Sequence, residues 1–154
     1  MTARFVLLFA ISLLAEAGEP ICPWLNAATA GGFLQGPVHV AVTRNGEDAA
    51  CEFTRENSAD RLRIEVVTLN APRDELAALK AQCEAPLAPL RSIGNEAVAC
   101  GIATKNGEAT QQVVGRVRKQ AFLVRLSAGD ASSSRATLRE RATKVAEQVA
   151  GILF

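Results

Sequence analysis

The sequence predicts an α+β fold in the order α-βββ-α-βββ-α, with helices packed on an antiparallel sheet and two disulfides. Three observations lead to this prediction. Apolar and polar residues alternate at strand spacing in several short segments, two Asn-Gly turns separate neighbouring segments, and three other segments carry apolar residues at helical spacing. Because short turns join consecutive strands, we expect those strands to pair antiparallel.

The first half of the chain predicts one helix and three strands. The helix is expected over residues 23–33, beginning at Pro23 and ending at Gly31-Gly32. Its inward residues are expected to be Trp24, Leu25, Ala28 and Leu34. Arg44-Asn45-Gly46-Glu47 predicts a tight hairpin, because Asn-Gly supplies the positive φ angles of a two-residue turn. The inward strand residues are expected to be Val38, Val40, Val42, Cys51, Phe53, Leu62, Ile64 and Val66.

The second half predicts a helix over residues 73–83, three strands and a long final helix. Pro72 suits the start of the first of these helices, and Pro86 and Pro89 indicate an extended connection. Strands are expected over residues 97–104, 111–118 and 120–127, with Phe122, Val124 and Leu126 facing the core. The final helix should cover residues 134–153, with an apolar stripe of Leu138, Ala142, Val145, Val149 and Ile152.

The two halves share one short sequence feature. Thr43-Arg44-Asn45-Gly46-Glu47 returns 61 residues later as Thr104-Lys105-Asn106-Gly107-Glu108, and Cys22 and Cys83 have the same offset. The recurrence indicates either a duplicated unit of three strands or the chance repetition of a common hairpin, since the other cysteines do not match. Both interpretations stay open at this point.

The first 17 residues are typical of a secretory signal peptide. Arg4 gives a positive start, residues 5–15 form an apolar run too short to span a bilayer, and Ala15 and Ala17 suit signal peptidase. The alternative is a buried N-terminal helix. We expect cleavage to leave residues 18–154 as one secreted domain, periplasmic or extracellular. Glu19-Pro20-Ile21 before Cys22 is not a lipid-attachment sequence, so a released product is expected.

Composition excludes several classes of partner. Lysine and arginine total 17 against 16 acidic residues, so the net charge is +1 and nothing in it favours binding to nucleic acid or an anionic membrane. No second long apolar run follows the leader, so no membrane span is expected. Beyond the leader the chain keeps one tryptophan, four phenylalanines and no tyrosine, which leaves little aromatic surface to stack sugars or bases.

Four cysteines remain after cleavage, and an even number in an oxidising compartment predicts two disulfides. Three connectivities are possible. We favour Cys22–Cys51 and Cys83–Cys100, because each pair then ties a helix end to a nearby strand within one half of the chain. The rival is a metal or redox site, but there is no Cys-x-x-Cys and only one histidine. We therefore expect no metal and no cofactor.

Four short motifs carry a resemblance to a known group of domains. They are Cys22-Pro23-Trp24-Leu25 at a helix start, Cys51-Glu52-Phe53 in a strand, Ile93-Gly94-Asn95-Glu96-Ala97 before a strand, and the strand from Gln120 to Leu126 before an alanine-rich helix. In these the chain resembles small extracytoplasmic domains of bacterial cell-envelope lipoproteins and of receptor-kinase sensor ends. The resemblance implies one curved antiparallel sheet packed by helices and pinned by disulfides. It implies no activity, because that group has no established catalytic residues.

No ordinary catalytic constellation is present. His39 is the one histidine, and a general base there would need a carboxylate such as Glu52 or Glu65 beside it. No Gly-x-Ser-x-Gly, His-Glu-x-x-His or phosphate-binding glycine loop occurs. Arg61 and Arg63 are available to pair with those carboxylates across neighbouring strands. We expect no enzymatic activity, with a small hydrolase that uses His39 and a carboxylate as the alternative.

Five residues are candidates for ligand contact. Asn95 and Glu96 follow Gly94 and precede a strand, which suits either a ligand-contacting loop or a turn in which Gly94 supplies a positive φ. The other candidates, Arg116, Arg118 and Arg125, form with Lys119 a modest basic patch that suits an anion or simply protects a sheet edge.

The sequence as a whole predicts an exported, non-enzymatic binding or interaction domain of the bacterial cell envelope. Its partner is an envelope protein or a small ligand that the sequence does not identify. A further alternative is a secreted inhibitor or accessory subunit, for which residues 84–93 are the long exposed loop that the sequence offers.

Overall fold

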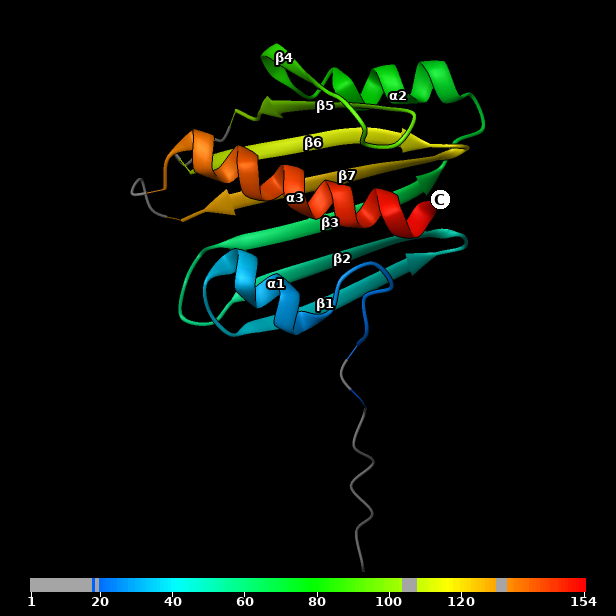
Figure 1. The fold of residues 1–154 in the computed structure, drawn as a ribbon. Coiled ribbons are helices and arrows are strands. Elements are labelled where there is room, and N and C mark those ends of the chain that lie inside the picture. Colours follow the sequence, from blue (N-terminus) through cyan, green and yellow to red (C-terminus); the bar gives the residue numbers. More distant parts are fainter. Residues whose placement is uncertain (1–17, 19, 104–107, 130–132) are drawn as a thin grey trace, which may run out of the picture.

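We analysed a computed structural model that describes residues 18, 20–103, 108–129 and 133–154. The predicted signal peptide, the second Asn-Gly turn and part of the loop before the last helix lie outside the described residues. The described chain forms a seven-stranded antiparallel sheet in the order β1-β2-β3-β7-β6-β5-β4, with three helices (Figure 1). The helices are α1 (Ala27–Leu34), α2 (Pro72–Lys80) and α3 (Arg135–Leu153). The strands are β1 (Val38–Asn45), β2 (Asp48–Arg55), β3 (Arg61–Thr68), β4 (Glu84–Leu90), β5 (Glu96–Gly101), β6 (Ala109–Val117) and β7 (Gln120–Ala128).

The α+β class, the antiparallel sheet and both favoured disulfides are confirmed. One strand is additional: β4 occupies the segment for which Pro86 and Pro89 predicted only an extended connection. The difference has a physical reason. β4 lies at the edge of the sheet and pairs only with β5, and an edge strand tolerates prolines because one side of its backbone has no ladder to complete.

The two faces of the sheet are covered by different helices. Helices α1 and α3 lie on one face, which we call the helix face, whereas α2 packs on the opposite face, which we call the open face (Figure 1). The helix face holds the main core, whose largest fully buried strand side chains are Phe53, Leu62, Ile64, Val66, Val113, Val117, Phe122, Val124 and Leu126. Gly115 is required in this core because a Cβ there would overlap the ring of Phe122.

The two halves of the chain do not place their helices alike. α1 joins α3 over the helix face, but Leu76 of α2 packs with Val114 and Leu123 on the open face. The three-stranded units β1-β2-β3 and β5-β6-β7 nevertheless meet in one sheet through the antiparallel pair β3 and β7. The helices therefore do not follow the repeat that the two hairpin sequences suggested.

The first helix begins later than predicted. Asn26 is the N-cap and its side chain accepts a hydrogen bond from Thr29 N at 2.8 Å, so Trp24 and Leu25 are buried ahead of the helix rather than on its face. The helix continues through Gly31-Gly32 to Leu34 and ends at Gln35, which has a φ of 61°. The predicted inward position of Ala28 is also wrong, since that residue is exposed.

The last two helices follow the predicted pattern with small differences. α2 ends at Lys80, before Cys83. In α3 the predicted stripe is buried except for Ile152, which is 57% exposed, because Leu153, four residues after Val149, packs against the core in its place. Lys144 and Glu140 form the expected ion pair at 2.8 Å.

The hairpin between β1 and β2 is confirmed, but its centre differs by one residue. Asn45 and Asp48 pair as the last residues of the strands, so the two-residue loop is Gly46-Glu47. The positive φ falls on Gly46, at 62°, and not on Asn45. A loop with glycine first suits a type II′ turn better than the type I′ turn that Asn-Gly favours.

Cys22 and Cys51 are joined across 29 residues, and Cys83 and Cys100 across 17. The first disulfide ties the segment before α1 to β2, and the second ties the segment after α2 to β5. Paired cysteines of this kind are typical of proteins that mature in an oxidising compartment. Among the described helices, none combines the length and the apolar character needed to cross a bilayer.

Candidate functional site

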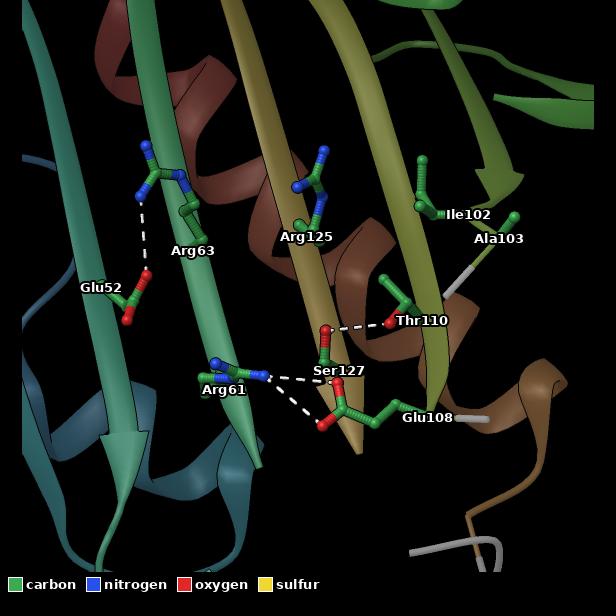
Figure 2. A pocket seen from close by; sticks show the side chains of 9 residues that line it. All are labelled: Glu52, Arg61, Arg63, Ile102, Ala103, Glu108, Thr110, Arg125 and Ser127. Carbon is green, nitrogen blue, oxygen red and sulfur yellow. Dashed lines mark hydrogen bonds and ion pairs between the residues drawn. The ribbon is translucent and has the colours of Figure 1, made fainter. Parts of the chain in front are cut away.

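The part of the open face that α2 leaves uncovered holds a charged pocket. Its volume is about 350 Å³. Figure 2 shows its lining: Glu52, Arg61, Arg63, Ile102, Ala103, Glu108, Thr110, Arg125 and Ser127. These side chains come from β2, β3, β6 and β7 and from the described ends of the β5–β6 connection. Strand alternation explains why the strand residues of this lining lie together, since every second residue of a strand points to the same face.

Strand pairing brings positive charges together at the centre of the pocket. Cα pairing between β3 and β7 places Arg63 directly opposite Arg125, and Arg61 opposite Ser127. Like charges at directly opposed positions of a sheet destabilise it unless other groups compensate them. The surroundings of each arginine therefore decide what this part of the open face can bind.

Two of the three arginines have carboxylate partners. Arg63 lies 3.1 Å from a carboxylate oxygen of Glu65 and 3.5 Å from one of Glu52. Arg61 lies 3.3 Å from a carboxylate oxygen of Glu108 (Figure 2). The expected cross-strand charge pairing is therefore present between Glu52 of β2 and Arg63 of β3, whereas Glu65 pairs with Arg63 within β3 and Arg61 pairs with Glu108.

Arg125 is the exception. Its Nε and one terminal nitrogen donate to Oε1 of Gln112 at 3.0 and 2.7 Å. Within the described part of the chain no carboxylate lies within 4 Å of its guanidinium group. Burial lowers the pKa of Arg125, the charge of Arg63 lowers it further, and Glu65 opposes the change. The guanidinium stays charged nonetheless, so a half-buried cation has a neutral amide as its hydrogen-bond acceptor.

Gln112 lies directly opposite Arg125 on the neighbouring strand β6 and holds its guanidinium group in place. Its side chain is fully buried, and its Nε2 lies 3.9 Å from Sγ of Cys83, so the amide oxygen is directed at Arg125. Beside the pocket, the hydroxyl groups of Thr110 and Ser127 share a hydrogen bond of 3.0 Å. The pocket thus presents the oriented guanidinium group of Arg125, the guanidinium group of Arg63 on the opposed strand, and the hydroxyl groups of Thr110 and Ser127.

Four of the five predicted contact residues lie together elsewhere, at the turn between β6 and β7. Oδ1 of Asn95 accepts a hydrogen bond from Arg118 N at 2.6 Å, and Asn95 N donates to Arg116 O at 2.7 Å. Gly94 has the predicted positive φ of 61°, and a Cβ there would overlap Arg116 O. We call Asn95, Glu96, Arg116 and Arg118 the turn cluster.

The side chains of Asn95, Glu96 and Arg116 are held by contacts within the turn cluster and with Lys80. Glu96 binds Lys80 at 2.8 Å and Arg116 at 3.3 Å, and Arg116 also donates to Arg118 O at 2.9 Å. The hydrogen bond from Lys80 lowers the pKa of the Glu96 carboxyl, burial opposes this, and Arg116 lowers it again. These contacts give the cluster a structural role in joining the β4–β5 connection to the β6–β7 turn. Ligand contact by these four residues stays a prediction.

Arg125 was predicted from the sequence as a contact residue, but its surroundings in the pocket were not. The prediction placed Arg125 in one basic patch with Arg116, whereas the structure separates the two along the open face. It also missed Gln112 and the opposition of Arg63 and Arg125. No local signal could reveal that opposition, because it depends on the exact register of β3 and β7, two neighbouring strands whose first residues are 59 positions apart in the sequence.

Among the described residues His39 forms an ion pair with Glu56, and not with Glu52 or Glu65, the two carboxylates named for the enzyme alternative. It lies on edge strand β1 with a side chain 76% exposed, and its Nε2 is 3.7 Å from a carboxylate oxygen of Glu56. Residues 84–93, the loop expected of an inhibitor, largely form β4. Within the described residues no group of three or more histidine, cysteine, aspartate or glutamate side chains is arranged to hold a metal ion.

No protein-family model, no curated protein and no solved structure matches this chain.

Proposed function

We propose that this chain is an exported, non-enzymatic binding domain of the bacterial cell envelope, periplasmic or secreted, and that its ligand presents an oxyanion to Arg125. The single observation that carries the proposal is the half-buried Arg125 guanidinium, which faces Arg63 across the strands and has Gln112 as its acceptor. The two disulfides and the leader-like start of the chain support export.

An oxyanion would relieve two unfavourable features of the pocket at once. It would supply a negative charge within contact of Arg125, which no described carboxylate does, and it would screen the repulsion between Arg63 and Arg125. Guanidinium groups bind carboxylates, phosphates and sulfates through paired, charge-assisted hydrogen bonds. The hydroxyl groups of Thr110 and Ser127 share one hydrogen bond, which leaves one of their two O–H groups as a further donor at the same site.

A binding role suits this pocket better than a catalytic one. The groups that line it are guanidinium, hydroxyl and carboxylate groups already held in ion pairs. His39, the residue that the hydrolase alternative requires, pairs with Glu56 at the sheet edge. A pocket whose described lining orients an anion, with no nucleophile and base in contact among those residues, has the properties of a receptor or an accessory domain.

Calorimetric titration of the disulfide-bonded protein with inorganic phosphate and with acetate tests the proposal. We expect saturable binding of at least one anion, and a loss of affinity of about tenfold in Arg125→Gln, since one charge-assisted hydrogen bond is removed. Arg116→Gln is the matched control and should bind within about twofold of the original protein. Equal affinity in Arg125→Gln and the original protein, or no saturable binding of either anion, would contradict the proposal.

A further inference from the structure

The two edge strands of the sheet differ in how they are protected from pairing with another chain. β4 carries Pro86 and Pro89 and shifts its register with β5 between Glu84 and Ala88, and both features block a further strand. β1 contains no proline and no lysine, and all eight of its residues pair with β2 without a shift. Among the described residues, the β1 edge is therefore a regular strand that neither proline nor a register shift protects.

The backbone groups on the free side of β1 follow from the hairpin geometry. Asn45 and Asp48 close the two-residue loop, and Glu56 N donates to Pro37 O at 2.9 Å. Both contacts place the odd-numbered residues of β1 in hydrogen-bonded pairs with β2, since such pairs alternate along an antiparallel ladder. The backbone N–H and C=O groups on the free edge belong to Val38, Val40, Val42 and Arg44.

We propose that β1 pairs antiparallel with β1 of a second copy of this chain, which joins two seven-stranded sheets into one continuous sheet. The register in which all four of these free-edge residues of each copy enter the new ladder has its two-fold axis at Ala41. Val40 then lies opposite Val42 of the other copy, and Val38 opposite Arg44. The contact is isologous, as in most homodimers, because the same strand serves both copies.

The side-chain pattern of β1 is self-complementary in this register. Even-numbered residues meet even-numbered residues, so Val38, Val40 and Val42 of both copies lie on the helix face. These valines are only partly buried and already pack against the core, so pairing extends the apolar surface of the helix face across the interface. On the open face the residues nearest the axis, Ala41 and Thr43, are small and uncharged.

The charges at the ends of β1 do not oppose this pairing. Arg44 is exposed, and its Cα partner on β2 is Ala49 of the main core, so Arg44 belongs to the helix face. In the proposed register Arg44 of each copy lies opposite Val38 of the other, which carries no charge. The net charge of +1 gives little long-range repulsion between copies.

Sedimentation velocity of the disulfide-bonded protein between about 10 μM and 1 mM tests the proposal, because a contact through one strand is small and binds weakly. We expect a reversible monomer–dimer equilibrium. Ala41→Lys places two like charges opposite each other at the axis and should raise the dissociation constant at least about tenfold. Ala41→Thr, a neutral strand-forming change, should leave the dissociation constant within about threefold. Circular dichroism and thermal unfolding establish that both variants are folded.

A matched pair of substitutions tests the register. Val38 lies opposite Arg44 of the other copy, so Val38→Glu should dimerise more tightly than Val38→Arg, which places two like charges opposite each other. Three results would overturn the proposal: a protein that stays monomeric throughout the range, a dimer that Ala41→Lys leaves intact, or a Val38→Glu variant that dimerises no more tightly than Val38→Arg. A monomer that captures an unrelated extended peptide at β1 would also overturn it, since the proposed occupant is a second copy.

Discussion

The helix face and the open face of the sheet are made by alternate residues of the same strands, yet the helix face holds the main core and the open face holds the charged pocket. In β7, Phe122, Val124 and Leu126 are buried under helices, whereas Arg125 and Ser127 line the pocket on the other side. The helix face is closed by α1 and α3, and the open face only in part by α2. One strand can therefore carry the core on one side and a charged surface on the other, where substitutions need not affect folding.

The largest expected effect distinguishes the two faces by stability. Phe122→Ala should lower the free energy of unfolding by about 3–5 kcal/mol, because it removes a fully buried ring from the core. Thr54→Ala, on the open face of β2, should change it by less than about 1 kcal/mol. Urea unfolding of the two variants measures both values. Similar losses in the two variants would mean that the faces are not energetically distinct.

The disulfides provide the second test. Replacing Cys22 and Cys51 by alanine should lower the free energy of unfolding by about 2–4 kcal/mol, since the bridge restricts the unfolded chain. The pair Cys83 and Cys100 closes 17 residues rather than 29, so the loop-entropy relation gives an effect smaller by about 0.5 kcal/mol. Denaturant unfolding of the two double variants compares them. A larger loss for Cys83 and Cys100 would show that the open-face bridge has a role beyond loop closure.

Gln112 links the stability of the open face to its binding. Gln112→Leu should lower the free energy of unfolding by about 1–3 kcal/mol, because it removes the acceptor of the half-buried Arg125. Added phosphate should recover part of this loss if the anion takes over the role of the amide. Thermal unfolding with and without phosphate measures the effect. A variant that phosphate does not stabilise would argue that Gln112 supports folding alone.

The smallest expected effect concerns Asp60, which joins the two halves of the sheet near the end of β7. Burial raises its pKa, but hydrogen bonds from Gly129 N and Arg55, both at 2.9 Å, outweigh burial and lower the pKa below its ordinary value. The unfolded state then binds more protons in acid, so this contribution is present above about pH 4 and is lost as pH falls through the folded pKa.

Asp60→Asn should therefore lower the free energy of unfolding by no more than about 1 kcal/mol at pH 7, because the ion pair is partly exposed. The difference from the original protein should shrink as the pH is lowered below about 4. Urea unfolding at pH 7 and in acid gives both numbers. A difference that stays constant over this range would mean that the carboxylate charge has no part in it.

Much of the fold could be predicted from the sequence because its strong signals are local. Alternation fixed the inward residues of β3 and β7, and the helical stripe of α3 was right up to Val149. The start of α1 was wrong because the cap at Asn26 outweighs the preference for a proline start at Pro23. β4 was missed because prolines usually argue against a strand, and only its place at the sheet edge makes them acceptable.

The candidate site was harder to predict, because it depends on contacts between distant segments. The inward residues predicted for β3 and β7 leave Arg61, Arg63 and Arg125 on the opposite face, and this is correct. The sequence could not show that Arg63 and Arg125 face each other, or that Gln112 supports Arg125, because both follow from strand order and register. Asn95 and Glu96 stood out as a motif because of Gly94, and the structure gives that motif a role in holding a turn.

Chemical-shift mapping by NMR tests most directly whether the open face is the binding surface. Phosphate is titrated into the isotope-labelled, disulfide-bonded protein, and the backbone amide signals and the arginine Nε signals are followed. If the anion binds at the open face, the largest changes occur at the Nε of Arg125 and at Arg63, Thr110 and Ser127, and the signals of α1 and α3 stay unchanged. Changes centred on α3 or on the turn cluster, with the Nε signal of Arg125 unmoved, would contradict binding at the open face.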